Sequence, residues 1–86
     1  MESYLKPIFD SRQSFYLKAT IIQENNIIKL KSYNTIVATI KDDKATISGI
    51  YSATTTRHQK EFLKQNNFKV TSTEQLIKDY LKKEEV

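Results

Sequence analysis

The feature that most constrains the fold is an alternation of apolar and polar residues through residues 27–41, IIKLKSYNTIVATIK. Such alternation is typical of a β-strand with one buried face. The even positions share that face, and two of them, Ser32 and Asn34, are polar. We therefore expect one long central strand with a bend or bulge at residues 32–34.

Two further strands are predicted on either side of this one, at residues 14–23 (SFYLKATIIQ) and 44–51 (KATISGIY). Asn25-Asn26 and Asp42-Asp43 separate the three segments, and both residue types tolerate the left-handed backbone that tight turns need. These turns set the expected cross-strand pairs: Ile21 with Leu30, Phe15 with Ile36, Ala45 with Ile40, and Ile47 with Ala38. All pairs lie on one side of the sheet, and a slip of one residue would destroy this agreement.

Two helices are predicted after the strands. Residues 56–59 (TRHQ) and 72–75 (STEQ) have the spacing of a capping box, with Thr56 and Ser72 as the caps. The first helix is expected to end near Gln65, with a left-handed stop at Asn66-Asn67. The second is expected to turn Leu76, Ile77, Tyr80 and Leu81 inward, and Lys78, Asp79, Lys82 and Lys83 outward.

Together these elements predict an α+β fold: an antiparallel three-stranded meander with a long bent central strand and two C-terminal helices packed on one face. We expect a single domain over residues 1–86, with a lead-in at 1–13, the meander at 14–51 and the helices at 54–84. Tyr4, Leu5, Ile8 and Phe9 of the lead-in are expected at the edge of the core. The predicted core is Phe15, Leu17, Ile21, Leu30, Ile36, Ile40, Ile47, Phe62, Leu63, Leu76, Ile77 and Leu81.

Composition excludes several classes of protein. The chain has 86 residues and no cysteine, so disulfides and thiolate metal sites are excluded. The N-terminus lacks the pattern of a signal peptide, and no apolar run is long enough to span a bilayer, so we expect a cytoplasmic protein without a membrane partner. The net charge of +4 favours anionic partners.

The sequence YSATTTRHQKEFLKQ, residues 51–65, contains the only histidine. A helix start with free backbone N–H groups, Thr54, Thr55, Arg57 and His58 could hold a phosphate or a carboxylate. Capping alone also accounts for threonines at this place, with His58 packed against Phe62 one turn later.

Catalysis and metal binding are the less favoured interpretations of the same segment. His58 could act as a base, but the chain contains no cysteine that could serve as a nucleophile. Asp10, Asp42 or Asp43 could be named as the acid of a catalytic set, but the sequence gives no geometric support for any of them. One histidine without clustered carboxylates makes no recognisable metal site, and we expect no cofactor.

The opposite face of the predicted sheet has a different character. It holds five lysines, two tyrosines and no acidic residue, although the chain contains ten Asp and Glu. Lysines neutralise phosphates and tyrosines stack on bases, a combination found on sheets that bind single strands. An exposed sheet face also needs polar residues for solubility, and Tyr16 and Tyr33 could simply pack across strands. The candidate nucleic-acid-binding residues are Tyr16, Lys18, Lys29, Lys31, Tyr33, Lys41 and Lys44.

Three segments resemble a family of small uncharacterised proteins encoded by phages and plasmids, mostly of Gram-positive bacteria. They are residues 14–19 (SFYLKA), 32–40 (SYNTIVATI) and 51–68 (YSATTTRHQKEFLKQNNF), and the resemblance extends over residues 8–80. It implies an origin in a mobile element, and therefore the cytoplasm of a bacterium or of an infected host cell, and it implies no activity. The chain departs from the family pattern at Leu17, where the pattern has a glycine.

The sequence therefore favours a small non-enzymatic binding module of the mobile-element type, with nucleic acid as its partner. One alternative is a protein-binding accessory or inhibitor of a host defence complex, similar in role to anti-CRISPR proteins. A simple mimic of DNA is disfavoured because no acidic face is predicted. A homo-oligomer formed through a sheet edge, at strand 14–23 or 44–51, is also possible. An enzyme that uses His58 is the least favoured interpretation.

Overall fold

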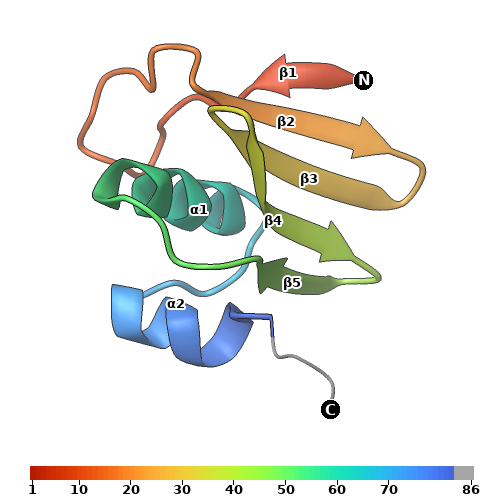
Figure 1. The fold of residues 1–86 in the computed structure, drawn as a ribbon, viewed down its shortest axis with the longest axis vertical. Coiled ribbons are helices and arrows are strands. Elements are labelled where there is room, and N and C mark those ends of the chain that lie inside the picture. Colours follow the sequence, from red (N-terminus) through yellow and green to blue (C-terminus); the bar gives the residue numbers. More distant parts are fainter. Residues whose placement is uncertain (83–86) are drawn as a thin grey trace.

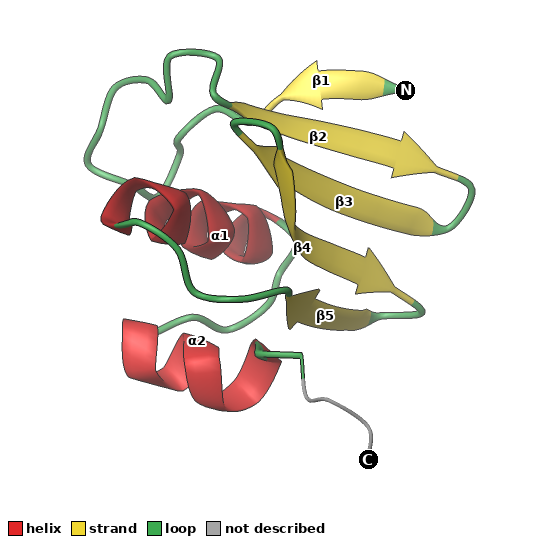
Figure 2. Ribbon diagram, viewed as in Figure 1, coloured by secondary structure: helices red, strands yellow, loops and turns green. Residues whose placement is uncertain are grey.

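The computed structural model describes residues 1–82. The chain forms five strands and then two helices, in the order β1 (Glu2–Tyr4), β2 (Ala19–Glu24), β3 (Ile27–Ser32), β4 (Thr35–Lys41), β5 (Lys44–Ile47), α1 (Ala53–Gln65) and α2 (Thr73–Tyr80). The strands make one antiparallel sheet in the order β1-β2-β3-β4-β5. Figures 1 and 2 show the two helices on one side of this sheet, and α1 contacts β3 and β4 whereas α2 contacts β5.

The α+β class is confirmed, but the three-stranded meander is wrong, because the sheet has five strands. One additional strand is β1, which pairs with β2 through Glu2↔Ile22, Ser3↔Ile21 and Tyr4↔Thr20. The sequence predicted only a lead-in for this segment. Three residues are too few to show an alternation, so no periodic signal marks this strand.

The other additional strand arises because the predicted long central strand is divided in two. Ser32 pairs with Thr35, so the chain reverses at Tyr33-Asn34, where only a bend was expected. Tyr33 has a positive φ of 56°, and its N–H donates to the carbonyl of Lys18 at 2.7 Å. The polar interruption in the alternation therefore marked the right place, but the backbone makes a full turn there.

A β-bulge between β3 and β4 changes which side chains are buried. Leu30 pairs with Ala38 and Lys31 with Ile36, which leaves Val37 as the extra residue. The extra residue reverses the alternation, so Val37 and Ala38 are both buried and Ile36 faces outward beside Lys31. The prediction of Ile36 in the core and Val37 outside was therefore wrong.

The start of the predicted first strand is also different. Residues 14–18 form a turn in which Tyr16 and Leu17 both have positive φ, and Lys18 N–H donates to the carbonyl of Phe15. The hydroxyl of Ser14 accepts a hydrogen bond from Tyr16 N–H at 2.9 Å, a local bond that competes with strand pairing. The expected pairing of Phe15 with Ile36 is therefore absent, and Leu17 is exposed. The other three expected pairs are confirmed.

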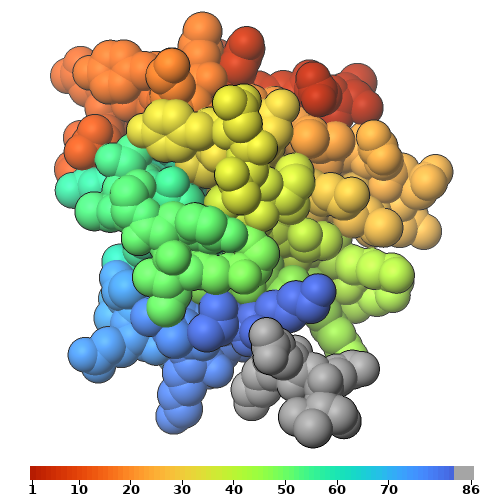
Figure 3. Space-filling model, in the orientation of Figure 1, coloured from red at the N-terminus to blue at the C-terminus, as the bar shows by residue number. Residues whose placement is uncertain are grey.

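The last strand and the first helix are displaced from their predicted ends. β5 stops at Ile47, and residues 48–52 lead into α1, which begins at Ala53 with Ser52 as its cap. The hydroxyl of Ser52 accepts from Thr55 N–H, so Thr56 is not the cap and lies in the first turn. In the space-filling view this linking segment runs across the near surface, below the β3–β4 turn (Figure 3).

The remaining helix ends agree with the sequence. Asn67 has a φ of 68°, and the N–H groups of Asn67 and Phe68 donate to the carbonyls of Lys64 and Leu63, which is the Schellman arrangement. Ser72 caps α2, where its hydroxyl accepts from Gln75 N–H. The prediction for α2 extended to residue 84. The described helix ends at Tyr80, and residues 83–84 of that prediction, with the outward Lys83, lie outside the described part of the chain.

The core lies between the sheet and the two helices. Seven of the expected residues are buried: Phe15, Leu30, Ile40, Ile47, Phe62, Leu63 and Leu76. Ile21 and Leu81 pack against this cluster while partly exposed, and Ile77 is only partly buried. Of the lead-in residues, Leu5 is buried but Tyr4, Ile8 and Phe9 are exposed. Ala19, Val37, Ala38 and Ala45 also belong to the core.

Candidate functional site

The five predicted lysines lie on the face of the sheet that the helices leave uncovered. Lys29 and Lys31 alternate on β3 with the buried Leu30, and Lys41 pairs with Lys44 at the β4–β5 turn. Lys18 precedes the buried Ala19 at the start of β2. Within residues 1–82 the only ion pair joins Arg57 and Asp10, so none of these lysines is paired.

The two predicted tyrosines do not join this face. Tyr16 is 73% exposed at the tip of the 14–18 turn. Tyr33 lies in the β3–β4 turn, and its ring centroid is 6.2 Å from that of the buried His58, on the side of the sheet that the helices cover. A different tyrosine, Tyr4 of β1, lies on this face beside Thr20 and Lys31. These three residues line a pocket of about 350 Å³ together with Glu2 and Ser3.

The expectation of a face without acidic residues was wrong. β1 brings Glu2 to the face, next to Ile22, and Glu24 at the end of β2 has the same phase as Ile22. Both carboxylates lie near the edge of the sheet that β1 forms. The lysines of β3, β4 and β5 are therefore the strongest positive part of this surface, while its β1 side is mixed in charge.

The residues of the predicted anion site at the start of α1 point in different directions. Thr55 and His58 are buried against the sheet, while Arg57 faces the loop before β2 and pairs with Asp10 at 3.0 Å. The hydroxyl of Ser32 lies 2.8 Å from His58 Nδ1 and 3.0 Å from Thr55 Oγ1. The structure therefore does not bring Thr54, Thr55, Arg57 and His58 together around one anion.

The contact between Ser32 and His58 has the distance of a nucleophile and its base, but not the accessibility. Both side chains are at most 2% exposed, and Phe15 packs edge-on against the imidazole at 4.7 Å between centroids. His58 Nε2 has no hydrogen-bond partner within residues 1–82. A substrate has no path to the hydroxyl of Ser32. The Ser32–His58 pair instead fills the space between α1 and the β3–β4 turn.

Burial also determines the charge of this histidine. Loss of solvent lowers the pKa of His58 below its ordinary value of 6.5, and the positive charge of Arg12 lowers this pKa further. The carboxylate of Asp10 acts in the opposite direction with a smaller effect. The imidazole is therefore neutral at physiological pH.

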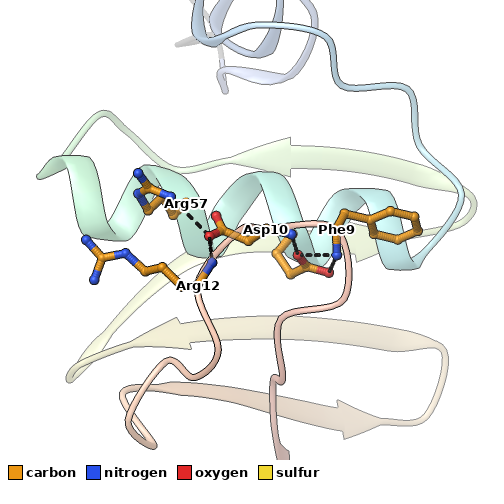
Figure 4. Close-up of polar contacts among 5 residues, drawn as sticks. Phe9, Asp10, Arg12 and Arg57 are labelled. Carbon is orange, nitrogen blue, oxygen red and sulfur yellow. Dashed lines mark hydrogen bonds and ion pairs between the residues drawn. The ribbon is translucent and has the colours of Figure 1, made fainter.

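A second buried polar group of α1 anchors the loop between β1 and β2. Glu61 is 2% exposed, and its carboxylate accepts hydrogen bonds from the backbone N–H groups of Phe9 and Asp10 and from the side chain of Gln65. Asp10 then accepts from Arg12 N–H and from the guanidinium of Arg57. Figure 4 shows Arg12 and Arg57 on the same side of Asp10, with the ring of Phe9 pointing away. The loop is thus held by its backbone, which leaves Phe9 58% exposed.

The outward side of α1 forms the floor of a groove. This groove has a volume of about 690 Å³, with Arg57, Lys60 and Lys64 along the helix and Phe9 and Tyr51 on its walls. Residues 51–65 therefore have two structural roles. One stripe of α1 is buried and joins the helix to the sheet, and the other supplies the basic side of the groove.

The sequence pattern did not predict Gln59 and Glu61 as buried polar residues, and it assigned no hydrogen-bonding role to Ser32, which it placed on the buried face. Gln59 donates from Nε2 to the carbonyl of Val37, which also accepts from Ser48 N–H, and to the carbonyl of Gly49 beyond the end of β5. A usable signal was present: Thr55, His58, Gln59 and Phe62 have the helical spacing of a buried stripe, although three of these residues are polar.

Among residues 1–82 no group of three or more possible ligands could hold a metal ion. In the same part of the chain, no helix is both long and apolar enough to cross a membrane. No curated protein and no solved structure matches this chain. A model of a protein family of unknown function, DUF8033, matches residues 3–79. Because this match covers the whole sheet except Glu2 and almost all of both helices, the chain belongs to the DUF8033 family of unknown function.

Proposed function

We propose that this protein is a non-enzymatic binding module that holds the phosphate backbone of a nucleic acid against the helix-free face of its sheet. The observation that supports this proposal best is the position of Lys18, Lys29, Lys31, Lys41 and Lys44 on one open face without an ion pair among residues 1–82. Unpaired lysines on an open surface contribute to nucleic-acid affinity by releasing counterions from the phosphates they contact.

The spacing of these lysines suits a backbone with repeated charges. Two residues along a strand cover about 7 Å, so Lys29 and Lys31 can reach successive groups of one chain. Lys41 and Lys44 are directly paired across two strands, about 5 Å apart between Cβ atoms. The exposed ring of Tyr4 lies beside Lys31 and offers a stacking surface for a base, which favours a single strand over a duplex.

Fluorescence anisotropy with labelled single-stranded and duplex oligonucleotides, over a range of salt concentrations, tests this proposal. Combined Lys29→Ala and Lys31→Ala substitutions should reduce the salt slope of log Kd by about 1.5 units, because about 0.7 to 0.9 is lost per phosphate contact. The matched control is Lys60→Ala with Lys64→Ala, which removes the same charge from the α1 groove.

The control variant should bind almost as well as the unmodified protein. Equal losses in the two double variants would mean that only net charge matters, and the sheet face would no longer be the site. Absence of salt-dependent binding by the unmodified protein would refute the proposal.

A protein partner, such as a component of a host defence complex, is the second candidate. It is favoured by the loop that Glu61 holds, which keeps Ile8 and Phe9 exposed on an anchored backbone. If no oligonucleotide binds, this surface becomes the better candidate, and Phe9→Ser should then abolish binding to that partner without loss of stability.

A further inference from the structure

One edge of the sheet is free and the other is partly covered. The edge of β2 is occupied by β1, and β5 is bridged by Leu81, with Lys82 N–H donating to the carbonyl of Ile47. Both edges that the sequence suggested for oligomerisation are therefore engaged. The outer side of β1 has no neighbouring strand in the described structure, and Figure 1 shows β1 as the outermost strand.

The phase of hydrogen bonding in β1 identifies which backbone groups are free. Met1 and Gln23 exchange two hydrogen bonds, and Leu5 N–H donates to the carbonyl of Ala19. In an antiparallel pair, bonded and non-bonded positions alternate along the strand. Met1, Ser3 and Leu5 therefore face β2, while the N–H and C=O groups of Glu2 and Tyr4 point away from the sheet.

We propose that β1 pairs with β1 of a second copy of this chain, antiparallel and with Ser3 on the two-fold axis. Glu2 of each copy then exchanges two backbone hydrogen bonds with Tyr4 of the other, so all four free groups of each strand are used. The two five-stranded sheets become one continuous sheet. This is the isologous contact that a symmetric dimer requires.

This register is favoured over its neighbours. A shift towards the N-terminus would place Glu2 opposite Glu2 of the other copy, and like charges directly opposite are destabilising. A shift towards the C-terminus would use Lys6, whose carbonyl already accepts from Gln65 Nε2 as the chain leaves the sheet for Pro7. Only pairing centred on Ser3 uses Glu2 and Tyr4 alone.

The same register also joins complementary side chains. Met1, 91% exposed, lies on the inner face and would be opposite Leu5 of the other copy. Leu5 lines a pocket of about 340 Å³ together with Phe15 and Leu17, the latter 65% exposed. Pairing therefore places the exposed methionine of each copy over an apolar pocket of the other, and this complementarity identifies a second copy as the occupant of the edge.

The dimer also affects the lysine face. A two-fold axis perpendicular to an antiparallel sheet keeps the two helix-free faces on the same side. The lysines of both copies would then lie on one side of the joined sheet, on the two flanks of a central strip that holds Glu2 and Glu24 of each copy. This consequence rests on the proposed function, whereas the dimer itself does not.

Sedimentation velocity over a wide concentration range, without nucleic acid, tests the dimer. We expect a concentration-dependent mass that rises from 10.1 kDa towards twice this value. Glu2→Pro removes an N–H that is unpaired in the monomer, so it should leave the fold intact. It should weaken the dimer about 10- to 100-fold, because two symmetric hydrogen bonds are lost.

Glu2→Ala is the matched control, because it removes the side chain and keeps the N–H, and it should still dimerise. Amide hydrogen exchange supplies a second measurement: Glu2 and Tyr4 should become protected as the dimer forms. A monomer at the highest concentration, or a dimer that Glu2→Pro does not weaken, would overturn the proposal. These outcomes are independent of oligonucleotide binding, so the two proposals can fail separately.

Discussion

The inner face of α1 and the helix-free face of the sheet differ in the surroundings of their polar side chains. On the helix, Thr55, His58, Gln59 and Glu61 are buried, and each makes at least one hydrogen bond with the sheet, the β1–β2 loop or the helix itself. On the sheet, five lysines face solvent without an ion pair among residues 1–82. Buried polar groups are costly unless they are bonded, so the first set fixes structure. The second set makes no ion pair in the described part of the chain, and the proposed function is assigned to it for that reason.

The largest expected effect on stability comes from the buried carboxylate. Glu61→Ala should lower the free energy of unfolding by about 3 kcal/mol, because it leaves the N–H groups of Phe9 and Asp10 without their acceptor. Urea denaturation followed by circular dichroism measures this change. The control is Glu24→Ala, an exposed carboxylate on the sheet, which should change stability by less than about 0.5 kcal/mol. Similar losses in the two variants would show that the α1 network does not differ from the surface.

His58 should make the same network sensitive to pH. Its pKa is lowered in the folded state, so below about 6.5 the unfolded chain binds the proton more readily than the native one. Stability is complete above that pH and should fall as the pH decreases from about 7 to about 5, by about 1.4 kcal/mol per unit of difference between the two pKa values.

The measurement is urea denaturation at several pH values, for the unmodified protein and for His58→Gln. The variant is expected to be less stable at neutral pH, but to lose less stability on acidification. Parallel pH profiles for the two proteins would contradict a buried, neutral imidazole. Arg12→Ala should diminish the pH dependence, since this positive charge contributes to the shift.

The sequence predicted the sheet better than the surfaces on it. Local alternation and turn residues were enough to pair β2 with β3 and β4 with β5, with Ile21 opposite Leu30 and Ile47 opposite Ala38, but not to pair β3 with β4, which were predicted as one continuous strand. The bulge at Val37 could not be predicted, because it follows from the turn at Tyr33-Asn34 and from the carbonyls that Gln59 satisfies. One extra residue then moved Ile36 onto the outer face.

The candidate site was predicted in part for the same reason. Lys29, Lys31, Lys41 and Lys44 lie at strand positions whose phase the bulge did not change, and Lys18 directly precedes β2, so alternation was enough to put them on a common face. Tyr16 and Tyr33 were assigned by alternation, but both lie in turns with positive φ, where alternation does not apply. Glu2 and Tyr4 reached the face through β1, a strand with no periodic signal.

The smallest expected effect concerns the turn that removed Tyr16 and Leu17 from the predicted strand. Leu17 has a φ of 62°, in the left-handed region, and its side chain is 65% exposed. A side chain costs about 1–2 kcal/mol in that conformation, whereas glycine adopts it freely. Glycine also adds entropy to the unfolded chain, which offsets part of the gain.

Leu17→Gly should therefore raise the free energy of unfolding by about 0.5 kcal/mol, although it removes an apolar side chain. The matched variant Leu17→Ala keeps the strain and loses the same exposed surface, so it should not be more stable than the unmodified protein. Urea denaturation of the three proteins separates these effects. Because Leu17 also lines the pocket beside β1, the glycine variant should weaken the proposed dimer while it strengthens the monomer fold. A glycine variant less stable than the alanine variant would show that residues 14–18 do not hold this turn in solution.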